Sequence, residues 1–390
     1  VWLVGQVPED VVESARSGRL IVNEPARGEW RVGSVTATLT EEGLRFVDAA
    51  RDGLVVWESP PNRAFVLAVL GDVAWEEYRG YFWADTRHEC ELVDQEVRSA
   101  TNDGGRLQIS GVLRGCGQQR EYTMDVEPGP EPGDVVLDVS GTRVDAMALV
   151  SARSTDAAVH GLGEQYAPFD ASGRIIPITV REQGVGRGLQ PLTFLADVTN
   201  RGAGGTQEMS YAAWASFVTG DVRGVELDPT REASHAFAVA DTRDASSVAL
   251  TSWAPTMTAV LTAAQTPPAL LERRGATDDR PKLHDWVLQG AVLGIQGGTA
   301  KVREAVESLQ AEGAELSAVW LQDWTGVRKA QLGDRLWWTW QLDQQQYPEW
   351  DEMVAEFNDD GIRVLTYVNT WLVDAAAKGD ESIRNLFAEA

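Results

Sequence analysis

The sequence predicts two domains, a large antiparallel β-sandwich followed by the first part of a (β/α)8 barrel. Up to about residue 266, short segments rich in β-branched and aromatic residues alternate with turn residues, which is typical of sheet-on-sheet proteins. After about residue 285, apolar strand segments alternate with amphipathic helices, a pattern that indicates a parallel sheet. The length of 390 residues also exceeds that of one ordinary domain.

The predicted sandwich spans residues 1–266 and consists of many short strands. Its clearest strand segments are 35–40, 54–57, 64–70, 107–113, 121–126, 135–139 and 247–253. Turn signals such as the Gly pair at 104–105 and the Pro- and Gly-rich segment 127–133 separate them. We expect residues 267–284 to form the connector between the two domains, with a short helix at 269–274.

The predicted barrel part spans residues 285–390. Its strands are 286–295, 316–321 and 362–368, and its helices are 299–312 and 350–360. A barrel uses about 31 residues per unit, so the second unit carries roughly 15 extra residues, at 325–347. They follow a strand, on the face where barrel active sites are built. Three strands cannot close a barrel, and we therefore expect the chain to be an N-terminal fragment of a longer protein.

The chain is strongly acidic, with 59 Asp and Glu against 34 Lys and Arg and a formal net charge of −25. This balance disfavours nucleic-acid binding, and no apolar run reaches the ~20 residues of a membrane span. The scarcity of Lys fits either adaptation to salt or a genomic preference for Arg codons, which is the simpler interpretation. Because no signal peptide is visible at residues 1–20, the sequence favours a cytoplasmic protein.

The two cysteines, Cys90 and Cys116, lie 26 residues apart in strand-like surroundings. Two buried free thiols are the favoured interpretation, and a disulfide across a hairpin is the alternative. The four His are scattered, and no Cys/His spacing indicates a zinc site. We expect neither a metal nor an organic cofactor.

The segment after the second barrel strand combines side chains that suit an anionic sugar. It contains Gln322, and Arg335 follows beside three clustered Trp. Arg offers a fixed fork of donors to an oxyanion, Trp offers an apolar face and one N–H donor, and Gln hydrogen-bonds hydroxyls without repelling an anion. We expect at least one of Trp337, Trp338 and Trp340 to be part of the core of the insertion.

Five segments in order resemble glycoside hydrolase family 31, and within it the α-sulfoquinovosidase branch. They are GLGEQ at 161–165, EQGVGR at 182–187, QGGT at 296–299, QDWTG at 322–326 and RLWW at 335–338. The resemblance implies a galactose-mutarotase-like β-sandwich before a (β/α)8 catalytic barrel. It also implies a retaining α-glycosidase whose substrates are small-molecule α-sulfoquinovosides such as sulfoquinovosyl glycerol.

The same resemblance implies binding roles for four residues. Arg335 matches the Arg that binds the sulfonate, and Trp338 matches the Trp whose indole N–H donates to it. Gln322 stands where the neutral α-glucosidases of the family have Asp, and Gln296 matches a second Gln of the sulfosugar-specific branch. A carboxylate ~4 Å from a sulfonate would cost several kcal/mol at an effective dielectric near 20, and an amide removes that repulsion.

The resemblance places both catalytic Asp residues on later strands, beyond Ala390. One would act as nucleophile and the other as acid/base, about 5–5.5 Å apart. We therefore assign no catalytic residue in this chain, and Asp323 does not take that role. The fragment alone is expected to be inactive.

Two positions depart from the family pattern, and they leave alternatives open. Asp334 stands where the family tends to have a basic residue, and Thr370 follows Asn369 where the pattern is Asn-Pro. Arg335 could instead form a surface ion pair with Asp334 or Asp343. A neutral α-glucosidase or α-xylosidase of the same family is the alternative enzyme, and a noncatalytic carbohydrate-binding protein is the alternative of another class.

Overall fold

The computed structural model of the chain describes residues 18–78, 81–180, 184–199, 203–228, 237–275, 282–330, 333–379 and 382–390. Contacts between residues divide the chain into two compact units, Val1–Asp278 and Asp279–Ala390. The division lies within the segment 267–284 that the sequence predicts as a connector.

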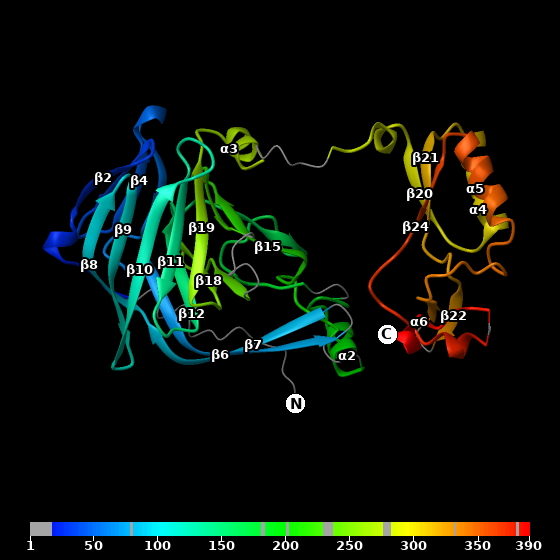
Figure 1. Cartoon of the computed structure of the whole chain (residues 1–390), viewed down its shortest axis with the longest axis horizontal. Helices are drawn as coiled ribbons and strands as arrows, with labels where there is room; N and C mark the ends of the chain where they lie inside the picture. The colour runs from blue at the N-terminus through cyan, green and yellow to red at the C-terminus, as the bar shows by residue number, and fades with distance from the viewer. Residues whose placement is uncertain are drawn as a thin grey trace. The chain divides into compact units, whose positions relative to one another are not determined.

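The first unit is a β-sandwich (Figure 1). Over the described residues, its largest sheet has the order β1–β8–β9–β10–β11–β19–β16–β15–β13, the second has the order β14–β17–β18–β12–β6–β7, and the third is β2–β3–β4–β5. The strands are β1 (Leu20–Val22), β2 (Gly28–Val32), β3 (Val35–Leu39), β4 (Leu44–Asp48), β5 (Leu54–Glu58), β6 (Val66–Tyr78), β7 (Tyr81–Leu92), β8 (Asp94–Asp103), β9 (Arg106–Gly115), β10 (Gln118–Pro128), β11 (Val135–Gly141), β12 (Ala146–Ala152), β13 (Val159–Gln165), β14 (Ile175–Ile178), β15 (Ser210–Thr219), β16 (Arg223–Leu227), β17 (Ala238–Asp241), β18 (Ser247–Ser252) and β19 (Thr256–Ala263). The helical segments are η1 (Glu24–Ala26), η2 (Ala49–Arg51), α2 (Leu192–Thr199) and α3 (Pro267–Arg274).

The predicted antiparallel sandwich is confirmed. Neighbouring strands of the two larger sheets run antiparallel, except that β1 pairs with β8 in parallel. In β3 every second residue is buried, as the two-residue period of a strand with one covered face requires. The seven predicted strand segments fall on β3, β5, β6, β9, β10, β11 and β18.

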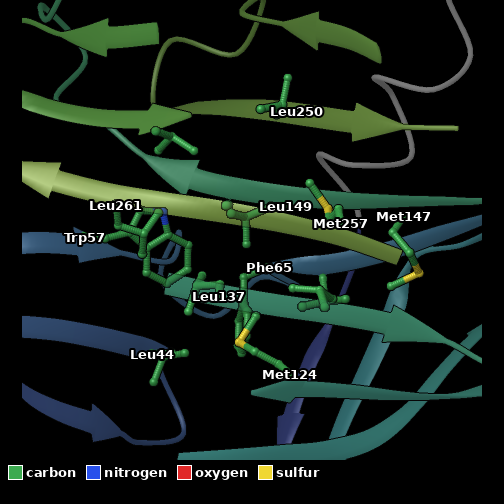
Figure 2. Packing of buried hydrophobic residues seen from close by; sticks show 14 of the residues in the cluster. Leu44, Trp57, Phe65, Met124, Leu137, Met147, Leu149, Leu250, Met257 and Leu261 are labelled. Carbon is green, nitrogen blue, oxygen red and sulfur yellow. The ribbon is translucent and has the colours of Figure 1, made fainter. Parts of the chain in front are cut away.

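Apolar side chains from all three sheets form the core of the sandwich. Figure 2 shows Trp57, Phe65 and Leu137 within this core, among strands that are far apart in the sequence. Trp57 is buried, and its indole N–H donates to the Ser151 hydroxyl at 2.7 Å. The buried indole therefore keeps its polar atom satisfied, as a buried donor requires.

Gln95 on β8 is fully buried and joins the two larger sheets. Its Oε1 accepts from the backbone N–H groups of Phe65 (2.9 Å) and Val66 (3.2 Å), which lead into β6 of the second sheet. Its Nε2 donates to the Tyr122 hydroxyl at 2.8 Å, and burial raises the pKa of that hydroxyl. One amide thus fixes the alignment of the layers.

Helix α3 packs on the sandwich. The Thr266 hydroxyl caps its N-terminus. At its other end, Arg273 pairs with Asp134 at 2.5 Å and Arg274 pairs with Glu226 at 2.6 Å. The first residues of the predicted connector therefore pack as part of the first unit.

The two cysteines form a disulfide, so the favoured interpretation of buried free thiols is wrong. Cys90 lies on β7, and Cys116 lies in the turn between β9 and β10, with their Cα atoms 5.9 Å apart. Cys90 is buried, but Cys116 is exposed, because it occupies a tight turn with a φ of 49°. The sequence shows the strand-like surroundings of both residues but not the turn that brings one against the other.

The second unit contains a parallel sheet of order β20–β21–β24, with helices α4 and α5 on one face (Figure 1). Its elements are η4 (Asp285–Leu288), β20 (Ala291–Ile295), α4 (Thr299–Ala311), β21 (Leu316–Leu321), β22 (Val327–Ala330), β23 (Gly333–Leu336), α5 (Trp350–Asp359), β24 (Arg363–Thr366), η5 (Ala375–Lys378) and α6 (Leu386–Glu389). Val302 and Val306 of α4 and Met353 and Phe357 of α5 pack against Val319 of β21. The helices therefore bury the expected amphipathic faces.

Two predictions for this unit need correction. The predicted strand 286–295 is extended only over β20, because its first residues form the 3-10 turn η4, and a short apolar run does not distinguish a strand from a helical turn. The predicted strand 362–368 is extended only over β24. Its near-continuous apolar run is typical of a buried parallel sheet, but Val292, Trp320 and Arg363, which point away from the helices, are exposed. Over the described residues, the face away from the helices is therefore covered only in part, at Ala318, which is buried.

Candidate functional site

Gln296 and Gln322 come together at the carboxyl edge of the parallel sheet. The strands β20 and β21 end side by side, with Ile295 opposite Leu321, so the next residue of each strand lies at the same edge. The Gln296 Nε2 donates to the Gln322 Oε1 at 2.5 Å. The structure thus brings these two predicted site residues into direct contact, as a neutral pair of amides.

Asp323 is buried, and its carboxylate is occupied by hydrogen bonds from the protein itself. It is 1% exposed, and it accepts hydrogen bonds from the Gly297 N–H at 2.8 Å, the Gln346 amide and the Tyr347 hydroxyl. Burial, together with the hydrogen bond to Asp323, raises the pKa of Tyr347. The carboxylate therefore ties the turn after β20 to the segment that leads into α5.

The insertion after β21 folds as a β-hairpin of β22 and β23. Lys329 lies opposite Asp334, and Arg328 lies opposite Arg335. Residues directly opposite in an antiparallel pair share one face of the ribbon, so the two pairs lie on opposite faces. Arg335 is exposed, and its side chain is thus available at the surface of the insertion.

The carboxylates that could neutralise Arg335 have other partners. Asp334 pairs with Lys329 at 2.9 Å, and Asp343 pairs with Lys378 at 2.7 Å. Burial alone would raise the pKa of Asp343, but the Lys378 ammonium and two backbone N–H groups outweigh it and lower that pKa. Within the described part of the chain, Arg335 has no ion pair, which argues against the alternative that it is a surface ion-pair partner.

Trp338 carries a buried indole N–H that has no hydrogen-bond partner among the described residues. Its ring centroid lies 6.3 Å from that of Trp371, and its carbonyl accepts from the Val373 N–H at 3.3 Å. Buried polar groups are almost always hydrogen-bonded, and each exception calls for an explanation. An oxygen atom of a ligand would satisfy this donor.

Two further indole donors join the segment after β21 to the loop after β24. Trp324 donates to the Tyr367 carbonyl and Trp340 donates to the Trp371 carbonyl, both at 2.8 Å. Asn369 shapes the same loop, because its Oδ1 accepts from the Trp371 N–H at 2.7 Å. The two loops therefore form one assembly on the carboxyl side of the sheet.

Sequence reasoning missed Arg328 and Trp371. The Arg328 guanidinium carbon lies 5.1 Å from the centroid of the buried Trp337 ring, and its Nε is buried without a partner among the described residues. Gly333 was the available signal, since a Gly between two short polar and apolar segments indicates a hairpin. Trp371 follows the third strand by a few residues, the position from which loops reach the carboxyl edge of a parallel sheet.

In the first unit, the segment at 161–165 lies on β13. Of the segment at 182–187, Glu182 and Gln183 lie outside the described residues. Arg187 is buried, its guanidinium carbon lies 3.9 Å from the centroid of the Tyr166 ring, and it donates to the Met209 carbonyl at 3.0 Å. This Arg therefore joins its loop to the segments that contain Tyr166 and Met209.

No family model matches the chain. It is 31% identical to the sulfoquinovosidase of Escherichia coli over 216 residues, and 27% identical to that of Agrobacterium fabrum over 336 residues. The chain is thus similar in sequence to two sulfoquinovosidases. A solved sulfoquinovosidase of glycoside hydrolase family 31 from E. rectale, in complex with an aza-sugar inhibitor, matches 90% of this chain with a TM-score of 0.69 and 23% identity.

The chain spans half or less of the proteins to which it is similar. The matches cover 55% and 85% of this chain, but 31% and 47% of the two relatives and 50% of the solved structure. In the described ranges, no helix is long and apolar enough to cross a membrane.

Proposed function

We propose that the protein containing this chain is a retaining α-glycosidase of the sulfoquinovosidase type, which hydrolyses α-sulfoquinovosides such as sulfoquinovosyl glycerol. The similarity to two sulfoquinovosidases supports this proposal. The observation that carries it is that Arg335 and Trp338 both have unused hydrogen-bond donors. Among the residues described, Arg335 has no acidic partner, although the protein is acidic, and the buried indole N–H of Trp338 has no acceptor.

Each residue of the proposed site has a distinct role. The Arg335 guanidinium would hold two sulfonate oxygens at once, and the Trp338 N–H would donate to the same group. Gln296 and Gln322 would hydrogen-bond the sugar or its sulfonate end without the repulsion that a carboxylate would add. No residue of this chain is assigned to bond cleavage. The two Asp residues of a retaining mechanism are expected beyond Ala390, about 5–5.5 Å apart.

The same proposal includes the domain organisation. Residues 1–266 would be the galactose-mutarotase-like sandwich, 267–284 the connector, and 285–390 the first three strands of a (β/α)8 catalytic barrel. The parallel order of β20, β21 and β24 supports the barrel assignment, because consecutive units of a barrel place neighbouring strands in parallel. The partner would be a small glycoside.

The test compares two substrates that differ only at C6, 4-nitrophenyl α-sulfoquinovoside and 4-nitrophenyl α-glucoside. The enzyme is the product of the full reading frame that contains this chain. We expect a kcat/KM for the sulfoquinovoside that is at least about a hundredfold higher, because unpaired buried donors reject a substrate that lacks their acceptor. A preference for the glucoside would assign the protein to the neutral α-glucosidases instead.

Replacing Arg335 by Met tests the sulfonate assignment. We expect kcat/KM for the sulfoquinovoside to fall by about a hundredfold or more, since a bidentate charge-assisted contact is lost. The value for the glucoside should stay within about twofold, because that substrate offers no anion to the lost guanidinium. An equal loss on both substrates would show that Arg335 does not recognise the sulfonate.

A further inference from the structure

The β22–β23 hairpin places two guanidinium groups on one face. Arg328 and Arg335 are directly opposite each other across the two strands. Like charges at opposite positions of an antiparallel pair destabilise it. The pairing is unexpected in a chain that has 59 acidic and 34 basic residues, where a carboxylate at either position would be easy to provide.

The opposite face of the same hairpin is neutralised. Lys329 and Asp334 are also directly opposite, and they form an ion pair. Neither Arg328 nor Arg335 forms an ion pair within the described residues, although ion pairs between Arg and carboxylates recur throughout the first unit. The positive charge of the hairpin is therefore concentrated on one face.

Contacts with an aromatic ring hold Arg328 in place. Its guanidinium carbon lies 5.1 Å from the centroid of the Trp337 ring, and that Trp is buried. The Trp337 N–H donates to the Gly326 carbonyl at 2.9 Å, which continues the hairpin pairing by one step, so Trp337 lies on the same face as Arg328 and Arg335. A guanidinium that contacts an aromatic face uses no N–H group in a hydrogen bond to the ring, so these groups remain able to donate to an anion.

The Nε of Arg328 is buried and has no hydrogen-bond partner among the described residues. Two guanidinium groups on one face, neither of them paired with a carboxylate, are free to bind an anion between them. An anion with three oxygens can accept from both forks at once.

We propose that Arg328 is a second guanidinium of the anion-binding part of the site, which together with Arg335 holds the sulfonate group of the substrate. This inference rests on the proposed function, since it concerns the group that distinguishes a sulfosugar from a neutral sugar. Arg328 is then a residue that determines specificity, and it takes no part in breaking the glycosidic bond.

The test replaces Arg328 by Met in the product of the full reading frame and measures both 4-nitrophenyl substrates. We expect kcat/KM for the sulfoquinovoside to fall by about ten- to a hundredfold, the range for losing a hydrogen bond to a charged group. The glucoside value should change by less than about threefold, and the rise of KM with added NaCl should become shallower, because one cation fewer faces the sulfonate.

Lys329→Met is the matched control. It removes the same charge one residue further along, on the neutralised face of the hairpin, where Lys329 is 91% exposed. Both substrates should be hydrolysed at nearly the original rate. Arg328→Lys keeps the cation and its contact with Trp337, and we expect it to recover part of the loss on the sulfoquinovoside.

The outcomes separate this inference from the proposed function. If Arg335→Met is selective for the sulfosubstrate and Arg328→Met is not, the proposed function stands and the second guanidinium is refuted. An equal loss on both substrates in Arg328→Met, with a lower Tm, would make Arg328 a structural partner of Trp337 only, and would also refute it. If neither Arg variant is selective, the proposed function itself fails.

Discussion

Trp338 and Trp340 lie two residues apart and differ in whether the indole N–H has a hydrogen-bond partner. The indole N–H of Trp340 donates to the Trp371 carbonyl, whereas that of Trp338 is buried with no partner among the described residues. A buried unsatisfied donor costs about 1–3 kcal/mol. Trp338 therefore lowers the stability of the ligand-free protein and favours any ligand that offers an oxygen.

Replacing Trp338 by Phe removes this donor and keeps an aromatic ring. We expect the free energy of unfolding of the 390-residue chain to stay the same or to rise by up to about 1 kcal/mol. In the product of the full reading frame, kcat/KM for the sulfoquinovoside should fall by about tenfold. Urea unfolding and kinetics measure the two effects.

Trp340→Phe is the control for the stability measurement. It removes a donor that is satisfied, so the Trp371 carbonyl loses its partner, and we expect a loss of about 1 kcal/mol. If Trp338→Phe destabilised the chain as much as Trp340→Phe does, the Trp338 N–H would have a partner within the folded protein, and its role in binding would lose its support.

At this scale the sequence predicted some contacts and missed others for a clear reason. Gln296 and Gln322 each follow a predicted strand, and neighbouring parallel strands end at the same edge, so their proximity follows from the fold class. The position of Arg328 opposite Arg335 depends on the register of a hairpin, and a shift of one residue would have placed Lys329 there instead.

Between elements, the ion pair of Asp343 with Lys378 joins the insertion to η5. Both side chains are largely buried, with 14% and 11% of their area exposed. The pKa of Asp343 is lowered, because the hydrogen bonds from Lys378 and from two backbone N–H groups outweigh the effect of burial. Its ionised form therefore stabilises the fold above its unfolded-state pKa of about 3.9, and that contribution disappears as the pH falls through the folded-state pKa.

We expect Asp343→Asn to lower the free energy of unfolding at pH 7 by about 2 kcal/mol, between the values for exposed and buried ion pairs. The difference from the original chain should begin to narrow below the unfolded-state pKa of about 3.9, where the carboxylate is protonated in the unfolded state, and should disappear below the lowered folded-state pKa. Urea unfolding at pH 7 and at pH 3.5 measures it. Asp334→Asn is the control, since that carboxylate is 53% exposed and should contribute little at either pH. A difference that stayed constant with pH would exclude an electrostatic origin.

The elements that the sequence predicted well are those with enough residues to show a period. Helices α4 and α5 and strand β21 agree with their predicted bounds within one residue. The turn η4 and the hairpin β22–β23 were missed, because segments of four residues show neither a helical nor a strand period.

For the molecule as a whole, the surplus of negative charge is the dominant electrostatic feature. The chain carries a net charge of −25, and many of its Arg residues are already paired locally with carboxylates. The remaining carboxylates repel one another, which opposes the compact state. The two interpretations of the composition, adaptation to salt and a genomic preference for Arg codons, can therefore be distinguished by the effect of salt on the Tm.

We expect the Tm of the chain at pH 7 to rise between 0.1 and 1 M NaCl, because the Debye length falls from about 10 to about 3 Å and screens the repulsion. Near the sequence pI of 4.5 the net charge is close to zero, so the same salt series should leave the Tm nearly constant. Differential scanning calorimetry over the salt series at both pH values measures these changes in Tm. A Tm that fell with salt at pH 7 would mean that the local ion pairs outweigh the surplus, and salt adaptation would then be refuted.

The bonds between the loops after β21 and β24 also bear on biosynthesis. The Trp338 ring packs near Trp371, and its carbonyl accepts from the Val373 N–H. The indole N–H groups of Trp324 and Trp340 donate to the carbonyls of residues 367 and 371. During synthesis, Arg328 and Arg335 therefore precede the loop after β24, which packs against their segment, by about forty residues. The anion-binding residues that we propose would therefore come together late in translation, once the third strand has joined the sheet.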